Sequence, residues 1–383
     1  MGEWKQCTIA DLGMVVTGKT PSTKIAELWD GAVHFVTPKD IQGLKHITNT
    51  ERRITDAGLQ KVKGSVLPPR AVCVSCIGNI GYTGMTTQNC VSNQQINSII
   101  VNSDNDPDFV YYLMRYLWPF FKNYEGQSTT LSILNKTQFS KISVTVPDKV
   151  TQKRIAEVLS ALDEKIAANA RINDNLQQQA MVLYASMFLD NPALETTAGT
   201  LKDIADITMG QSPSGSSYNE DGNGEVFYQG RAEFGYRFPT RRLYTTEPKR
   251  MAEAGDVLLS VRAPVGDLNV AYERCCIGRG LGAIHGRSGY QSFVLYTMFA
   301  LRPQLDVYNG EGTVFGSINR NALNDMPIDI PSEDAIAAFE AVVRPMDAMI
   351  RSNYEENCRF QELRDSLLPR LMSGEVDVSD IDI

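Results

Sequence analysis

The chain contains a long internal repeat. Four pairs of matching segments lie 184 residues apart, and a fifth pair near the start of the chain lies 192 residues apart. The pairs are VTVP at 144–147 with IDIP at 328–331, DxxIxxNxxxN at 163–173 and again at 347–357, FVxYxM at 109–114 and 293–298, NK at 135–136 with NR at 319–320, and GxxPS at 18–22 and 210–214. This period exceeds the roughly 20 to 50 residues of a solenoid unit. It predicts two copies of one architecture, each a globular domain followed by a long helix.

Heptad spacing marks the two long helices. Between 155 and 187 the seam positions alternate in steps of four and three, as in a coiled coil, and the second copy keeps this register. Two such helices either pack on each other or each cover their own domain, and polar seam residues favour mutual packing. In an antiparallel pair Asn169 would meet Asn357 and Asn173 would meet Asn353, and these pairs would fix the helix register.

Outside the two long helices, the residue pattern indicates α+β domains with short strands and long loops. Residues 72–77 and 97–101 are typical of strands, residues 109–121 of a helix that ends near Pro119, and Thr151 of a helix N-cap. The predicted fold is therefore two repeated α+β domains separated by two long antiparallel coiled-coil helices. The predicted division is a first domain at 1–150, a first helix at 151–189, a linker at 190–198 that runs into the polar residues 196–200, a second domain at 199–333, a second helix at 334–373 and an acidic tail at 374–383.

Composition narrows the class of protein. No run approaches 18 apolar residues and no signal pattern opens the chain, so we expect a cytoplasmic protein without a membrane partner. The seven cysteines are irregularly spaced, and the single CxxC, Cys73 to Cys76, fits buried strand thiols better than a metal site. The net charge is −8, but residues 334–383 hold 11 acidic against 5 basic residues. Nucleic acid is thus not excluded as a ligand, although a basic partner subunit would supply much of the phosphate binding.

One motif suggests a nucleotide site. Residues 13–20, GMVVTGKT, satisfy the P-loop pattern in full, and taken alone they would predict a P-loop protein. Three observations oppose this. Pro21 follows at once where a helix should begin, the preceding residues are a poor buried strand, and the second copy has Gln211 in place of Lys19. No other catalytic or cofactor motif is present, so we expect a chain without a cofactor that is not an enzyme by itself.

The loops instead carry side chains suited to reading DNA. Arg and Lys match guanine in the major groove, and Asn and Gln match adenine. The candidates are Lys19, Lys39, Arg52, Arg53, Asn79, Gln94 and Lys136 in the first domain, and Gln211, Arg231, Arg241, Arg242, Arg262, Arg279 and Arg320 in the second. The pairs Lys39/Arg231, Arg52/Arg241, Arg53/Arg242 and Lys136/Arg320 are favoured because both copies keep a cation. A helical adaptor whose domains bind protein is the competing interpretation.

These features together resemble a known family. The domain–helix–domain–helix order, the GKTP at 18–21, the ISVTVP at 142–147 running into QKRIA at 152–156, and the closing LLPRLMSGE at 367–375 are similar to the specificity subunit of type I restriction–modification systems. The resemblance covers essentially the whole chain and is weakest in the middle of each domain. A specificity subunit of another combined restriction–methylation enzyme is a near alternative.

The resemblance implies a division of labour. Two target recognition domains would each read one half of a split, asymmetric sequence in double-stranded DNA, with the helices as a spacer between them. Two methyltransferase subunits and the restriction subunits would dock on the chain and carry out methylation and cleavage. The second helix departs from the pattern, because QKRIA at 152–156 becomes IAAFE at 336–340.

Overall fold

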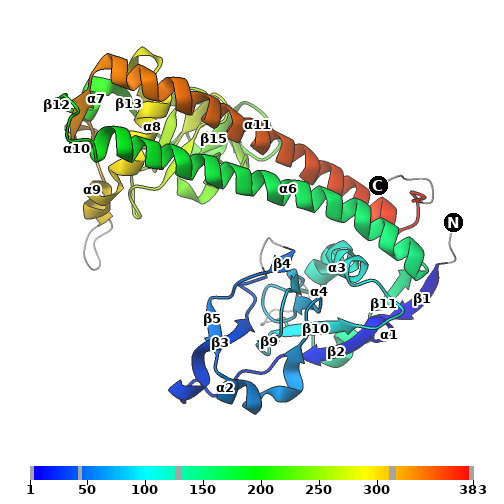
Figure 1. Ribbon diagram of the computed structural model, residues 1–383. Coiled ribbons are helices and arrows are strands. Elements are labelled where there is room, and N and C mark those ends of the chain that lie inside the picture. Colours follow the sequence, from blue (N-terminus) through cyan, green and yellow to red (C-terminus); the bar gives the residue numbers. More distant parts are fainter. Residues whose placement is uncertain (1–3, 42–44, 126–131, 310–315, 379–383) are drawn as a thin grey trace. The chain divides into compact units, whose positions relative to one another are not determined.

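The computed structural model describes residues 4–41, 45–125, 132–309 and 316–378. It separates into two compact units, Met1–Asn169 with Glu355–Ile383, and Ala170–Tyr354. Each unit holds one α+β domain and one part of each long helix (Figure 1). The sequence repeat is therefore a repeat of structure.

Two sheets and a two-stranded ribbon form the β part of unit 1. The ribbon pairs β1 (Lys5–Thr8) with β11 (Ser143–Val146) and so joins the first and last strands of the domain. One sheet has the order β2-β10-β7-β8-β4, with bounds Gly13–Thr17, Ile96–Val101, Val72–Ser75, Thr83–Thr86 and His46–Ile47. The other has the order β5-β3-β9-β6, with bounds Arg52–Ile54, Trp29–Val36, Cys90–Ser92 and Val66–Leu67. The helices are α1 (Ile9–Leu12), α2 (Asp56–Lys61), α3 (Pro107–Tyr116), α4 (Trp118–Glu125) and α5 (Lys136–Ser140).

Unit 2 repeats this plan. Its ribbon pairs β12 (Thr196–Thr200) with β22 (Pro327–Pro331). One sheet has the order β13-β21-β18-β19, with bounds Ala205–Met209, Leu281–Gly286, Val257–Ser260 and Leu268–Val270. The other has the order β14-β16-β15-β20-β17, with bounds Tyr218–Asn219, Leu243–Thr245, Glu225–Tyr228, Cys275–Ile277 and Met251–Ala252. The helices are α7 (Leu201–Ile204), α8 (Gln291–Ala300), α9 (Arg302–Asp306) and α10 (Arg320–Asn324).

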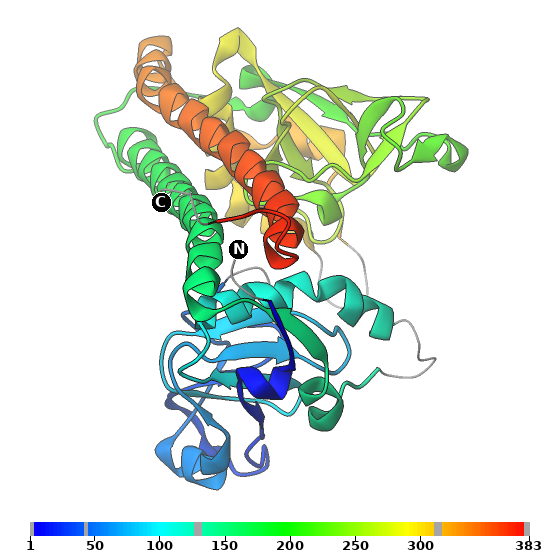
Figure 2. The ribbon, with the colours of Figure 1, turned by 90° about the vertical axis from the view of Figure 1, so that its right-hand side faces the viewer.

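The long helices are α6 (Lys149–Tyr184), which continues as a π-helical turn over Ala185–Leu189, and α11 (Glu333–Met372). The first part of α6 packs on the last part of α11 in unit 1, and the opposite ends pack in unit 2, so the helices are antiparallel in both (Figures 1 and 2). Apolar seam residues are buried in each unit, among them Ile155, Leu159, Phe339 and Val343. This confirms the predicted heptad seam.

The seam asparagines pair as the antiparallel register predicts. Asn169 Nδ2 donates to Asn357 Oδ1 at 3.0 Å, and Asn353 Nδ2 donates to Asn173 Oδ1 at 2.8 Å. The other two amide groups donate to backbone carbonyls of the facing helix, Asn173 to Ile350 and Asn357 to Ile166. Each amide is therefore satisfied across the seam, which keeps its burial from being costly.

Several local expectations are corrected by the structure. Residues 196–200, expected as a linker, form strand β12, because the edge of β22 is available to pair with them. The helix expected at 109–121 is two helices that meet at Leu117, with Pro119 in the first turn of α4, where a missing N–H costs little. The expected N-cap Thr151 lies inside α6, which is capped by Asp148: its Oδ1 accepts from the backbone N–H groups of Val150 and Thr151.

Two further features of the structure concern the expected buried thiols and the expected lack of a membrane-spanning segment. Cys73 and Cys76 are buried, and burial raises the pKa of Cys73 to about 11 and that of Cys76 to about 12, so these thiols stay protonated at neutral pH. Over the described part of the chain, no His, Cys, Asp and Glu side chains group as metal ligands would. In that same part, no helix has the length and hydrophobicity to cross a membrane.

Candidate nucleic-acid interface

Four chain segments meet at one edge of the domain in unit 1. They are residues 17–20 from the end of β2, the turn 76–82 between β7 and β8, residues 93–96 leading into β10, and residues 132–136 leading into α5. Backbone hydrogen bonds join them: Gly18 to Ile96 (3.0 Å), Cys76 to Gln95 (2.7 Å), Gly78 to Ser132 (3.2 Å) and Leu134 to Cys76 (2.8 Å), with the N–H donor named first. We call this edge the rim of domain 1.

Domain 2 has the same rim, built by the same bonds. Its segments are 209–212, 261–267, 278–281 and 316–320. The matching bonds are Gly210 to Leu281 (2.9 Å), Val261 to Gly280 (3.0 Å), Ala263 to Gly316 (2.9 Å) and Ile318 to Val261 (3.1 Å). An isolated bridge in each domain, Ile77 with Ile133 and Arg262 with Ser317, completes the match. The two rims are therefore equivalent position by position.

Close backbone packing at the rim explains why Gly18 recurs as Gly210, and the structure of residues 13–20 contradicts the P-loop interpretation. A Cβ at Gly18 would overlap the carbonyl oxygen of Asn93, and one at Gly210 would overlap that of Gly278, so the backbones meet too closely for any other residue. Residues Gly13–Thr17 form strand β2, and residues 20–25, directly after Lys19, are not helical. A phosphate-binding loop must open a helix. The nucleotide interpretation of residues 13–20 is wrong.

Eight of the predicted DNA-binding residues lie on the two rims. They are Lys19, Asn79, Gln94 and Lys136 in domain 1, and Gln211, Arg262, Arg279 and Arg320 in domain 2. All eight are exposed. Two of the segments are held together by side chains, since the Thr20 hydroxyl donates to Gln94 Oε1 in domain 1 and the Arg279 N–H donates to Ser212 Oγ in domain 2. Residues scattered over the sequence are thus brought to one edge of each domain.

The other six predicted residues lie off the rims and have other partners. Lys39 is paired with Glu51 at 3.5 Å, Arg53 donates to Asn49 at 3.0 Å, and the Arg52 guanidinium lies 3.6 Å from the centre of the Trp29 ring. In domain 2, Arg231 pairs with Asp267 at 2.5 Å, Arg241 with Glu273 at 2.5 Å, and Arg242 with Glu233 at 2.6 Å. Within the described residues, no ion pair engages the rim cations. The rim cations therefore differ from Lys39, Arg231, Arg241 and Arg242, whose charges are offset by an acidic neighbour.

Strand pairing also corrects two of the predicted equivalences. Phe35 of β3 pairs with Arg52, and its counterpart Phe227 of β15 pairs with Leu243. The pairs Arg52/Arg241 and Arg53/Arg242 are therefore wrong by two positions. The pair Lys136/Arg320 is right, because each residue opens its helix directly after a capping asparagine.

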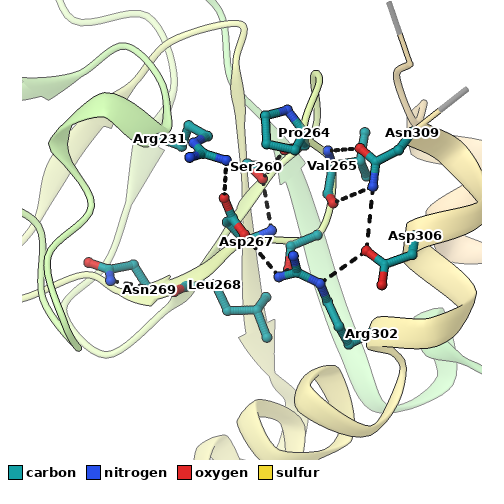
Figure 3. A network of polar contacts seen from close by, with 11 residues as sticks. Arg231, Ser260, Pro264, Val265, Asp267, Leu268, Asn269, Arg302, Asp306 and Asn309 are labelled. Carbon is teal, nitrogen blue, oxygen red and sulfur yellow. Dashed lines mark hydrogen bonds and ion pairs between the residues drawn. The ribbon is translucent and has the colours of Figure 1, made fainter. Parts of the chain in front are cut away.

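A network of polar contacts holds the rim turn of domain 2, residues 262–267 (Figure 3). Ser260 Oγ donates to the carbonyl of Pro264 at 2.8 Å and accepts from the N–H of Asp267 at 2.9 Å. Arg302 of α9 donates to the carbonyl of Gly266 at 2.6 Å and pairs with the Asp267 carboxylate at 3.0 Å. Asn309 exchanges two hydrogen bonds with the backbone of Val265. The turn is therefore fixed by contacts from three residues outside it, Ser260, Arg302 and Asn309.

The rim turn of domain 1 keeps the serine contacts seen in domain 2 and replaces the arginine contact. Ser75 Oγ makes the same two backbone contacts, to the carbonyl of Asn79 at 2.6 Å and from the N–H of Tyr82 at 2.9 Å. The place of Arg302 is taken by Trp118, whose ring lies 5.4 Å from that of Tyr82. The two serines were missed in the sequence, although the pattern SxxxxxG at 75–81 and 260–266 is a further trace of the repeat.

A pocket of about 470 Å³ adjoins the network in domain 2. Arg231, Asp267 and Arg302 line it together with apolar side chains including Phe234, Leu268 and Phe299. Its two arginines both contact the Asp267 carboxylate, which is common to the pocket and the turn. The pocket therefore belongs to the support of the rim, and both of its arginines are held by ion pairs with Asp267.

Known proteins match this chain over much of its length. Residues 1–178 match the sequence model of the family described as "Type I restriction modification DNA specificity domain". The specificity subunit assigned to the type I restriction enzyme MjaX of Methanocaldococcus jannaschii is 29% identical over 294 residues, which are 71% of this chain and 69% of that protein. The specificity subunit of the MjaIX enzyme of the same organism is 22% identical over 99% of this chain and 95% of that protein.

A solved structure supports the fold. The crystal structure of the type I restriction–modification S subunit from M. genitalium has a TM-score of 0.59 and 15% identity, and the match covers 97% of this chain and 96% of that one. At this identity the match concerns the fold alone. The family model thus matches residues 1–178, and the two relatives, both named as type I specificity subunits, extend the similarity over 71% and 99% of this chain.

Proposed function

We propose that the chain recognises double-stranded DNA through its two rims, each reading one half of a split, asymmetric target. The observation that carries this proposal is the recurrence of one rim in both domains, with exposed Lys, Arg, Asn and Gln side chains on the same four segments. The same backbone hydrogen bonds recur in both rims, but the side chains on them differ. This is expected of two DNA-binding sites that share one architecture and prefer different base sequences. In this proposal residues 1–150 and 199–333 are the two target recognition domains.

The chain itself would be non-catalytic, and partner subunits would carry out methylation and cleavage. The net charge of −8 leaves the chain short of cations for tight binding to phosphates, so basic partners fit the proposal. We propose that the two methyltransferase subunits and the restriction subunits dock on the long helices. Val342 and Met349 support this, since they lie two turns apart on α11 and are 54% and 52% exposed.

The helices would also set the distance between the half-sites. The Asn169–Asn357 and Asn173–Asn353 pairs support a fixed helix register, because a shift by one heptad would leave the buried amides of Asn169 and Asn173 without these partners.

The proposal is tested with the complex of this chain and its methyltransferase subunits. Long-read methylome mapping of cells that carry the intact system should give one split motif with two unequal halves and a fixed gap. A mobility shift with a duplex that contains this motif should require the complex, and the isolated chain should bind weakly. A continuous motif, or tight selective binding by the isolated chain, would contradict the proposal.

A further inference from the structure

The equivalence of the two rims allows base-reading residues to be separated from phosphate-binding residues. A contact to phosphate carries no sequence information, so the same charge serves in either domain. A contact to a base edge must change when the base changes. If the two domains read different half-sites, positions with the same charge in both rims should face phosphate, and positions whose chemistry changes should face bases.

One rim position keeps its charge. Lys136 and Arg320 each stand at the first residue of a short helix, directly after Asn135 or Asn319, whose side chain caps that helix. Both are exposed. This position is therefore cationic in both domains.

Two rim positions change from neutral to arginine. The bridges Ile77–Ile133 and Arg262–Ser317 make Arg262 the counterpart of Ile77. Asn93 and Gly278 donate equivalent hydrogen bonds, to Val36 and Tyr228, which makes Arg279 the counterpart of Gln94. Arg262 and Arg279 are exposed, and they have no acidic partner among the described residues. Domain 2 thus gains two uncompensated guanidinium groups where domain 1 has an apolar and an amide side chain.

The backbone at both arginines is held in place. Arg262 begins the turn that Ser260, Arg302 and Asn309 fix from residue 264 to residue 267 (Figure 3). Arg279 lies between two glycines whose backbones pack closely on that of Gln229. A fixed backbone lowers the entropic cost of placing a guanidinium group against a base edge.

We infer that Arg262 and Arg279 read guanines in the half-site of domain 2, whereas Lys136 and Arg320 contact phosphates in both half-sites. A guanidinium group donates two parallel hydrogen bonds to O6 and N7 of guanine. The half-site of domain 2 then contains guanine at the positions these residues reach, and Gln94 offers domain 1 an amide that matches adenine. This inference rests on the proposed function and assigns roles within the same site.

The test uses the complex with the methyltransferase subunits and its mapped target duplex. Guanines of each half-site are replaced singly by 7-deazaguanine, which keeps O6 but lacks the N7 acceptor. In one half-site we expect binding by the unaltered protein to weaken by roughly ten-fold at two guanines. Arg262→Gln should abolish the effect of 7-deazaguanine at one of these guanines and Arg279→Gln at the other, because each variant already lacks the arginine that donates to N7.

Two matched variants separate the roles. Arg320→Gln should weaken binding to target and random duplexes by the same factor, and should reduce the slope of log K against log salt by about one. Arg287→Gln serves as the control, since Arg287 follows β21 at the end opposite the rim and pairs with Asp206; it should change neither binding nor specificity.

The outcomes are distinct. If the complex shows no split target, the proposed function fails. If a split target is found but neither half responds to 7-deazaguanine, or if Arg262→Gln and Arg279→Gln weaken all duplexes equally, the proposed function stands and the guanine assignment is overturned. The assignment is also overturned if the two variants alter different halves of the target.

Discussion

Asp163 and Asp347 occupy the same repeat position, yet they meet guanidinium groups from different parts of the chain. Each accepts a hydrogen bond from a tyrosine of its domain, Tyr112 at 2.6 Å and Tyr296 at 3.1 Å. Asp163 pairs with Arg364 of α11 at 2.8 Å, whereas Asp347 pairs with Arg237 from a loop of domain 2. The repeated Asp is thus a structural anchor between a domain and its helix, and the sequence had given it no role beyond the repeat.

The buried pair in unit 2 should be costly to break. The Arg237 side chain is 5% exposed, so Arg237→Leu leaves a partly buried Asp347 carboxylate without its cation. We expect a loss of about 3 kcal/mol in the free energy of unfolding of unit 2, measured with urea. Adding Asp347→Asn should recover much of the loss, because a neutral amide still accepts from Tyr296. Arg287→Leu breaks an exposed pair and should cost less than about 1 kcal/mol; an equal cost for both arginines would contradict a buried pair.

At the scale of elements, both long helices begin after a polar side chain that caps them. Asp148 precedes α6, and its counterpart Ser332 precedes α11, where Ser332 Oγ accepts from the N–H of Ala335 at 3.3 Å. Hydrogen bonds from Thr151 lower the pKa of Asp148. The carboxylate is therefore stabilised in the folded chain relative to the unfolded one.

The cap should give a pH-dependent contribution to stability. Asp148→Ala should lower the free energy of unfolding of unit 1 by about 1 kcal/mol at pH 7. Because the folded pKa is lowered, this contribution is present above the ordinary Asp pKa of 3.8 and is lost as pH falls through the folded pKa. The difference between Asp148→Ala and the unaltered chain should therefore shrink below about pH 4. At pH 7 Asp148→Asn, whose amide oxygen can also cap, should match the unaltered chain to within a few tenths of a kcal/mol; a constant difference for Asp148→Ala would rule out the carboxylate as the cap.

Periodic elements could be predicted from the sequence, and connections between distant segments could not. The heptads gave both long helices to within a few residues, because burial of one stripe repeats along the chain. Strand β12 was missed because only pairing with β22, more than a hundred residues away, makes Thr196–Thr200 extended. The Arg52/Arg241 equivalence failed because the offset between the two copies changes within the domain, from 192 for Phe35 and Phe227 to 191 for their strand partners Arg52 and Leu243.

The rim could be predicted from the sequence only in part. Its residue types were visible as loop cations and amides, and eight of the fourteen candidates lie on it. Their convergence depends on backbone bonds such as Cys76 to Gln95, which join segments with no local pattern in common. The network around Asp267 could not be found from the sequence, because domain 1 replaces Asp267 and Arg302 with Tyr82 and Trp118.

At the scale of the whole molecule, the proposed spacer role of the helices predicts how the target changes when they are lengthened. One heptad is inserted into α6 between Leu176 and Leu183, and a matching heptad into α11 between Met346 and Asn353. The pair keeps the seam in phase on both helices and adds about 10 Å, or roughly three base pairs of B-DNA. The preferred gap between half-sites should lengthen by that amount, while both half-site sequences stay the same, as read by methylome mapping. Insertion into α6 alone should weaken the helix pair, because it moves the α6 residues on one side of the insertion out of register with α11. Changed half-site bases with an unchanged gap would mean that the helices do not set the spacing.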